Sequence, residues 1–322
     1  MKKLGENGLS GTSKSKSLID KFESVSAPPE VICDGDSWVF GCEIADPEIA
    51  KKYNSTTHPG AYDFLPENDA YRIPKIFPTH LSKLLNVPVT NLSWPADDNG
   101  TILRRTINYI SQKYLANNIP TDNLFVIIGW SSPERNSFWY IDDSIPLSHP
   151  FRLWPQVPHF ESKEQEKFWE LYVAYLWNAE EYIPRYVLNV LQLQNFCIAH
   201  NIKWMCFNSF YQTPNEIPDH WHDLNINEEI EKIKGRIGGH NYQISTNPLK
   251  RVMHINDYSA LWASIDPVRF YKKDKPNNTF KSYIETPKNK IIPPLVGWHP
   301  SPRGHKAWAR ELFRYIKQHN LY

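Results

Sequence analysis

A serine and a histidine near opposite ends of the chain have the sequence contexts that nucleophilic catalysis requires. Ser37 follows a short apolar run at residues 31–33 and the turn-forming residues Asp-Gly-Asp at 34–36. Gly35 permits a sharp turn, and a helix that begins at Ser37 would aim its amide at an anion. A serine hydroxyl becomes nucleophilic when a base removes its proton and donors hold the resulting oxyanion. Ser37 is therefore the candidate nucleophile.

The candidate base is His299, in the sequence Trp-His-Pro-Ser-Pro-Arg-Gly-His at residues 298–305. A residue followed by proline favours an extended conformation, which leaves the imidazole free to project toward a sheet edge. His305 is the competing candidate, but at the start of a helix we expect it to pack or to cap. The sequence predicts that Ser37 and His299 lie within hydrogen-bond reach, about 2.6–3.5 Å apart.

The elements that must position these two residues alternate between strand and helix patterns. Continuous apolar runs predict buried parallel strands, and amphipathic spacing predicts helices. The predicted strands are residues 31–33, 87–92, 124–128 and 202–207, and the predicted helices are residues 74–85, 99–115, 162–201 (interrupted at Pro184) and 302–319. This alternation predicts an α/β fold with a parallel sheet and helices on both faces. The polar motifs fall at the carboxyl ends of the strands, where such sheets hold their sites.

We expect two regions along the chain. Residues 1–28 are rich in Ser, Lys and Gly and form a flexible arm with at most a short helix at 17–24. Residues 29–322 form one domain. Its insertions, at residues 43–73, 137–158 and 210–295, are expected to set specificity.

Two motifs resemble a known family. Residues 35–41 (Gly-Asp-Ser-x-x-x-Gly) resemble the first block of the SGNH (GDSL-like) hydrolases, and residues 299–305 resemble their last block. Residues 91–99 are similar to the second block, whose glycine falls on Ala96. Gly-Trp-Ser-Ser at 129–132 takes the place of the third block, Gly-x-Asn-Asp, and this variant is similar to SGNH proteins of tailed phages. The resemblance implies a three-layer α/β/α fold with a flavodoxin-like sheet and long insertions.

The resemblance also implies an activity, hydrolysis of an acyl ester by a serine esterase or O-deacetylase without metal or cofactor. Ser37 would attack, and His299 would act as general base and then as general acid. The oxyanion would be held by the amides of Ser37 and Ala96 and by the hydroxyl of Ser131. The expected substrate is a small-molecule or glycan acyl ester.

The chain departs from the family pattern at three positions. Alanine at 96 costs little if the oxyanion donor there is a backbone amide, and Ser131 is a shorter donor than asparagine. The family's aspartate, three residues before the histidine, is Val296, which cannot orient an imidazole. Three alternatives are open. A carboxylate from elsewhere could replace the aspartate, with Asp266 as first candidate, or a backbone carbonyl could accept the His299 Nδ1 proton. In the third alternative the site is catalytically inactive. We favour the carbonyl-supported Ser–His dyad.

Two other functions stay open at this point. A catalytically retired SGNH fold could serve as a structural or glycan-binding module of a virion, which Val296 and the 12 tryptophans would suit. An acyltransferase would use the same site with an alcohol as acceptor. We expect most tryptophans simply to fill irregular gaps in the core.

Composition excludes several classes of partner. Lys plus Arg number 36 against 35 for Asp plus Glu, so the totals favour neither nucleic acid nor an anionic membrane. No segment approaches the roughly 18 apolar residues of a transmembrane helix, and the N-terminus lacks the apolar stretch of a signal peptide. We expect the four cysteines to be reduced and structural; they are Cys33, Cys42, Cys197 and Cys206. We expect a cytoplasmic protein, or a virion-associated one if it is of phage origin.

Overall fold

The computed structural model describes residues 28–53, 61–139, 150–153, 163–172, 179–210, 256–275, 277–286, 295–296 and 298–322. Apart from Pro28, the predicted N-terminal arm lies outside the described residues. The predicted insertions at 43–73, 137–158 and 210–295 lie partly outside them.

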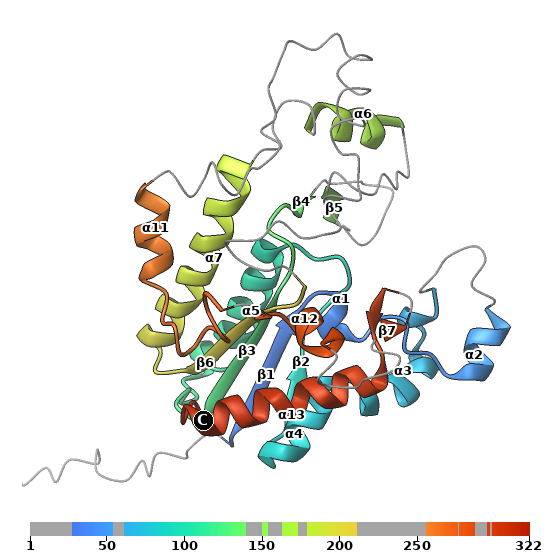
Figure 1. The fold of residues 1–322 in the computed structure, drawn as a ribbon, viewed down its shortest axis with the longest axis horizontal. Coiled ribbons are helices and arrows are strands. Elements are labelled where there is room, and N and C mark those ends of the chain that lie inside the picture. The colour runs from blue at the N-terminus through green and yellow to red at the C-terminus, as the bar shows by residue number, and fades with distance from the viewer. Residues whose placement is uncertain are drawn as a thin grey trace, which may run out of the picture.

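The centre of the fold is a parallel sheet with the strand order β2–β1–β3–β6 (Figure 1). Its strands are β1 (Glu30–Gly35), β2 (Val89–Asn91), β3 (Leu124–Trp130) and β6 (Lys203–Asn208). Each lies on one of the predicted apolar runs. Isolated parallel bridges from Cys206 to Phe270 and from Asn208 to Thr279 extend the edge beyond β6. This strand order is the flavodoxin-like one, which places β1 and β3 side by side at the topological switch point.

Helices surround this sheet, and two short antiparallel pairs accompany it. The helices are α1 (Ser37–Phe40), α2 (Pro47–Lys52), η1 (Ala61–Phe64), α3 (Pro66–Arg72), η2 (Ile73–Lys75), α4 (Phe77–Leu85), α5 (Asn99–Lys113), η3 (Leu115–Asn117), α6 (Lys163–Leu171), α7 (Ala179–Ala199), α11 (Asn256–Ala263), α12 (Phe280–Glu285) and α13 (Pro302–Gln318). The paired strands are β4 (Asn136–Trp139) with β5 (Pro150–Leu153), and β7 (Leu295–Val296) with β8 (His299–Pro300).

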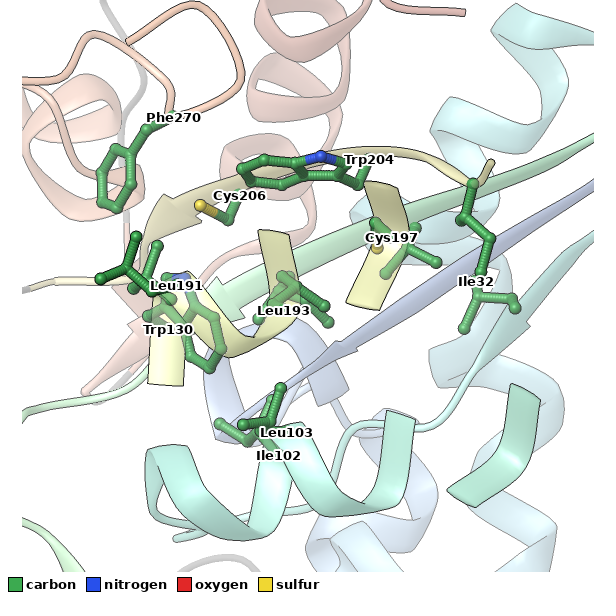
Figure 2. Close-up of a cluster of buried hydrophobic side chains, with 14 of the residues drawn as sticks. Ile32, Ile102, Leu103, Trp130, Leu191, Leu193, Cys197, Trp204, Cys206 and Phe270 are labelled. Carbon is green, nitrogen blue, oxygen red and sulfur yellow. The ribbon is translucent and has the colours of Figure 1, made fainter. Parts of the chain in front are cut away.

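The two faces of the sheet bury separate hydrophobic clusters, because successive side chains of a strand point to opposite faces. On β1, Ile32 packs with side chains of α5 and α7, while Val31 and Cys33 pack with side chains of α1, α4 and α13. Figure 2 shows the first cluster, in which Trp130 and Trp204 lie among residues of α5 and α7. The fold is therefore three-layer α/β/α, as the sequence predicts.

Tryptophan and cysteine side chains fill this core. Trp130, Trp204 and Trp308 are among the largest fully buried side chains. All four cysteines are buried and none forms a disulfide. Burial raises the pKa of the Cys33 and Cys206 thiols well above the ordinary value, so these thiols are neutral and act as small apolar groups.

The predicted interruption at Pro184 is wrong. Helix α7 runs from Ala179 to Ala199 with Pro184 inside it. Pro184 lacks the N–H that would bond the carbonyl of Glu180, and its ring crowds that carbonyl, which together cost about 3 kcal/mol inside a helix. The buried apolar side chains of α7 outweigh that loss.

A partly buried cation joins α5 to the end of β1 and to the loop after β2. Arg105 Nε lies 3.2 and 3.1 Å from the two carboxylate oxygens of Asp34, and its guanidinium also pairs with Asp97. It donates to the carbonyl of Gly35 at 3.2 Å as well. Asp34 is fully buried and accepts further hydrogen bonds from Thr106 Oγ1 and the Gly35 amide. Arg105 thus connects the end of β1, just before Ser37, with the loop after β2.

We predict that Arg105→Met destabilises the protein by about 3–5 kcal/mol, because it leaves Asp34 buried without its cation. Urea denaturation measures this loss. The matched control is Arg104→Met, which removes an exposed arginine from the same helix and should change stability by less than about 0.5 kcal/mol. Equal effects of the two substitutions would contradict the role given to Arg105.

Candidate active site

Ser37 lies at the turn from β1 into α1. Asp36 caps that helix, since its Oδ1 accepts a hydrogen bond from the Trp38 amide at 3.0 Å. A Cβ atom on Gly35 would lie 2.3 Å from Val39 Cγ2 and 2.7 Å from the carbonyl oxygen of Gly129. Only glycine therefore lets α1 approach the ends of β1 and β3 this closely. The turn presents Ser37 at the carboxyl edge of the sheet, as the sequence predicts.

His299 reaches the same place from the C-terminal part of the chain. It pairs with Val296 across the short β7–β8 ladder, and the side chain of Ser301 caps the following helix, α13, by accepting from the Gly304 amide at 3.1 Å. His299 Nε2 lies 2.9 Å from Ser37 Oγ. The structure thus brings together two residues that are 262 positions apart in sequence.

A carboxylate faces the other side of the His299 ring. Glu43 Oε1 lies 3.3 Å from His299 Nδ1, and Glu43 Oε2 accepts a hydrogen bond from the Trp298 amide at 2.8 Å. The Glu43–His299 contact is an ion-pair contact and not a linear hydrogen bond. Catalytic contacts are often this loose before substrate binds. Serine, histidine and glutamate therefore stand in the order of a catalytic triad.

At Val296 the structure favours the alternative in which a carboxylate from elsewhere takes the place of the aspartate, but that carboxylate belongs to Glu43. The carbonyl-supported dyad is wrong, because the group that faces Nδ1 is the side chain of Glu43. Asp266 is not the replacement either. Its Oδ1 accepts from the amides of Val268 and Arg269 in the turn after α11, and its side chain pairs with Arg269.

Glu43 is poised to stay ionised. Its burial alone would raise the pKa of its carboxyl, but the close contact with the His299 ring, the charge of that ring and the amides of Trp298 and His299 outweigh that effect. The pKa of Glu43 accordingly lies below its ordinary value, and the group is a carboxylate at neutral pH. A carboxylate in this position can orient the imidazole and stabilise its protonated form.

Ala96 has a backbone conformation that favours glycine, the residue of the family motif at this position. Its φ is +64°, in the left-handed region where an L-residue other than glycine costs about 1–2 kcal/mol. The expectation that alanine costs little is therefore wrong for the backbone conformation, whereas the role of the Ala96 amide as an oxyanion donor stays a prediction. The loop stays near the nucleophile because the Trp94 amide donates to the Gly35 carbonyl at 3.1 Å.

Ser131 lies directly after β3 and is almost fully buried. Its Oγ accepts from Arg135 Nη1 at 2.9 Å, and its hydroxyl bonds the carboxylate of Asp36. The side chain of Asn99 bonds both its amide and its carbonyl, at 2.8 and 3.1 Å. The predicted role of Ser131 as an oxyanion donor stays a prediction, and it requires this hydroxyl proton to turn away from Asp36.

Arg135 lies behind the nucleophile turn. Its Nη1 is 3.5 Å from Asp36 Oδ2, and its guanidinium stacks over the ring of Phe210, with 5.3 Å to the centroid. Burial raises the pKa of Asp36, and the charge of Arg135 opposes this rise. Sequence reasoning missed this arginine because it follows the third motif by a few residues and belongs to no motif.

His305 is a helix cap. Its Nδ1 accepts a hydrogen bond from the Phe77 amide at 3.2 Å, at the start of α4, where the N-cap residue Ile76 offers no side-chain acceptor. The ring is fully buried, which lowers the pKa of His305 to about 3. It is therefore neutral at all ordinary pH values, and the expectation that it packs or caps is confirmed.

Comparisons with known proteins give one family and several structures. A family model described as a family of unknown function (DUF6071) matches residues 62–230. No curated protein matches the sequence. Among solved structures, a member of the lipolytic protein G-D-S-L family from Veillonella parvula is 9% identical, with 90% of this chain and 98% of that chain covered and a TM-score of 0.37. A catalytic mutant of an acetylxylan esterase from Geobacillus stearothermophilus is 13% identical, with 91% and 96% covered and a TM-score of 0.37. A psychrotrophic esterase from Pseudoalteromonas is 11% identical, with 90% and 97% covered and a TM-score of 0.33.

Among the residues that the structure describes, no three His, Cys, Asp or Glu side chains are grouped so that they could hold a metal ion. No helix in this part of the chain has both the length and the apolar character needed to cross a membrane.

We predict that Glu43→Gln lowers kcat for a short-chain ester by about 10³–10⁴-fold, because a neutral amide cannot stabilise the imidazolium and favours the wrong tautomer. Steady-state kinetics on an activated acetyl ester measure the change. The control is Glu48→Gln, which changes an exposed glutamate of α2 and should leave kcat within about twofold of wild type. A loss below about tenfold for Glu43→Gln would remove Glu43 from the triad.

Proposed function

The chain belongs to DUF6071, a family of unknown function, and we propose that it is an SGNH-type serine hydrolase that cleaves acyl esters. One observation carries the proposal: Ser37 Oγ lies 2.9 Å from His299 Nε2, while Glu43 faces Nδ1 of the same ring at 3.3 Å. The order of the three groups is what activation of a serine requires. The motifs around Ser37 and His299, which resemble those of the SGNH hydrolases, support the same conclusion.

The reaction proceeds through an acyl-enzyme. His299 Nε2 takes the Ser37 proton as Oγ attacks the ester carbonyl carbon, and Glu43 balances the charge of the imidazolium. The imidazolium then gives that proton to the departing alkoxide, and the C–O bond of the ester breaks. Water attacks the acyl-serine by the same route, with His299 as base, and releases the carboxylic acid and free Ser37.

The oxyanion is held by the amides of Ser37 and Ala96 and the hydroxyl of Ser131. The first of these amides lies at the start of α1, and the Ala96 loop is held to the end of β1 through Trp94. Ser131 contributes when its hydroxyl turns from Asp36 toward the substrate. Arg135, which bonds Ser131 Oγ, places a positive charge beside the developing negative one.

Exposed aromatic side chains support a glycan ester as substrate. Trp94 is 43% exposed and Phe64 is 53% exposed, with ring centroids 5.3 Å apart. Trp298, next to the base, is 82% exposed. Flat exposed rings can cover the apolar face of a sugar, and polar groups at the serine would then meet its O-acyl substituent.

Two alternative functions use the same fold. A retired SGNH domain would act as a structural or glycan-binding module, for example in a virion of the phages whose proteins the third motif resembles. The presence of Glu43 opposite His299 favours the enzyme over this alternative. An acyltransferase would pass the acyl group to an alcohol, and added alcohols or sugars would then divert the product from the free acid.

The nucleophile is tested by covalent labelling. A fluorophosphonate probe should label wild-type protein at Ser37, identified by peptide mass spectrometry, and the protein should hydrolyse an activated acetyl ester. Ser37→Ala should abolish both while leaving Tm nearly unchanged, since the hydroxyl contributes little to packing. Wild-type protein that neither reacts with the probe nor turns over any short-chain acyl ester would decide for the retired fold.

The glycan preference is tested at the aromatic pair. We predict that Trp94→Ala raises KM for an acetylated oligosaccharide by about tenfold, equivalent to about 1.4 kcal/mol, and raises KM for a small activated acetyl ester by less than about twofold. The control is Ile198→Ala, which removes another exposed apolar side chain, from α7. An equal rise in KM for both substrates would show that Trp94 does not contact a sugar.

A further inference from the structure

The segment of residues 61–72, which comprises η1 and α3, is packed in an unusual way. Helix α3 buries Asn68 and Arg72, both of them polar. In η1, Asp63 is 3% exposed while the neighbouring Phe64 is 53% exposed. A helix that packs on a core normally buries its apolar side and leaves its polar side in water. This segment therefore requires another reason for its position.

The buried polar side chains of this segment all bond the same loop. Asn68 Nδ2 donates to the carbonyl of Ile44 at 3.0 Å, and its Oδ1 accepts from the Asp46 amide at 3.0 Å. Arg72 Nη1 donates to the carbonyl of Phe40, and its guanidinium lies over the Phe40 ring at 3.8 Å. These contacts bind the main chain of the loop from Phe40 to Asp46.

Asp63 accepts hydrogen bonds from Glu43, the residue of that loop whose side chain faces His299. The Glu43 amide donates to both carboxylate oxygens of Asp63, at 2.9 and 3.1 Å. Burial raises the pKa of Asp63 to about 6, although the Glu43 amide and the Cys42 thiol, both hydrogen-bonded to the carboxyl, oppose the rise. At pH 7 and above the group is ionised, and both of its oxygens can accept from that amide.

Glu43 depends on such a contact because of its backbone conformation. Its φ is +64°, a left-handed value that is uncommon for residues other than glycine and asparagine. Strained conformations persist when the surrounding structure over-determines them. The carboxylate of Asp63 fixes the Glu43 amide, and the side chain of Asn68 fixes the carbonyl of the following residue, Ile44. Together they direct the Glu43 side chain toward His299.

We propose that Asp63, Asn68 and Arg72 are positioning residues, and that residues 61–72 form a polar clamp whose task is to hold Glu43 against His299. The proposal rests on the proposed function, because it gives the clamp an effect on catalysis only through the Ser37–His299–Glu43 triad. None of the hydrogen bonds made by these three side chains goes to Ser37 or His299. Apart from a direct charge interaction between Asp63 and His299, their effect on the reaction therefore passes through the Glu43 loop.

The experiment compares Asp63 variants in two backgrounds, wild type and Glu43→Gln. The rate of Ser37 labelling by a fluorophosphonate and kcat for an activated acetyl ester are both measured at pH 7.5 and well below Tm. In the wild-type background, Asp63→Ala should lower both by about 10–100-fold, since a misplacement of about 1 Å can cost 10²-fold. Asp63→Asn keeps one acceptor oxygen and should recover most of that loss. In the Glu43→Gln background, either substitution should change the rates by less than about twofold, because coupled residues are not additive.

Two controls separate positioning from folding. Glu67→Gln, at an exposed site on α3, should leave both rates within about twofold of wild type. Asn68→Ala tests the clamp at an independent contact and should repeat the dependence on Glu43 if Asp63→Ala fails to fold. Thermal melting reports stability separately. A purely structural residue would lower Tm equally in both backgrounds and slow both backgrounds by the same factor.

The outcomes distinguish this inference from the function on which it rests. The clamp alone would be overturned if the wild-type protein is active but the Asp63 and Asn68 substitutions lower the rates equally in both backgrounds. A loss of less than twofold from these substitutions would overturn it as well. A wild-type protein with neither labelling nor turnover would overturn the serine hydrolase and the clamp together. If Asp63→Ala lowers the rates only in the wild-type background, and Asp63→Asn recovers most of that loss, the result supports both the serine hydrolase and the clamp.

Discussion

The geometry of the site depends on one ion-pair network, that of the partly buried Arg105 with the buried carboxylates of Asp34 and Asp97. Asp34 lies on β1 and Asp97 in the loop after β2, so this cation fixes the distance between the end of β1, which leads to Ser37, and the loop that carries Ala96. A cation shared by two buried carboxylates tolerates little displacement, because movement would leave a buried carboxylate without its partner. Backbone donors for an oxyanion are useful only if they are held in place before the reaction begins.

Around this edge, three buried acids interact with nearby cations. Arg105 serves Asp34, Arg135 serves Asp36, and the charge of Arg72 acts on Asp63. Glu43 differs, since the group that faces it is His299. The fixed charges thus compensate one another, and the imidazole is the group whose charge changes during the proposed reaction.

Sequence reasoning predicted the layers of the fold and the two residues that meet, but not the third. Continuous apolar runs predicted the buried strands. Ser37 and His299 stand in local sequence motifs that identify them as candidates without a structure. Glu43 has no such context, because its position depends on a left-handed φ and on Asp63 and Asn68, which come from a segment about twenty residues further along. The expectation at Val296 failed for this reason: it followed the spacing near the histidine, whereas the carboxylate comes from the loop after the nucleophile. An acidic residue soon after the glycine that ends α1 was the one available sign.

The long separation of the nucleophile and the base along the chain has a consequence for synthesis on the ribosome. Ser37 emerges 262 residues before His299, and helix α13, which covers α4 and one face of the sheet, follows the histidine. A nascent chain that already contains the nucleophile therefore lacks its base, and the apolar side chains of α4 that α13 covers stay uncovered until α13 has been synthesised. This part of the core can complete its folding only after α13 has emerged, and until then its apolar surface is exposed to aggregation or to chaperones. The proposed esterase activity would thus arise only in a chain that has been translated through α13.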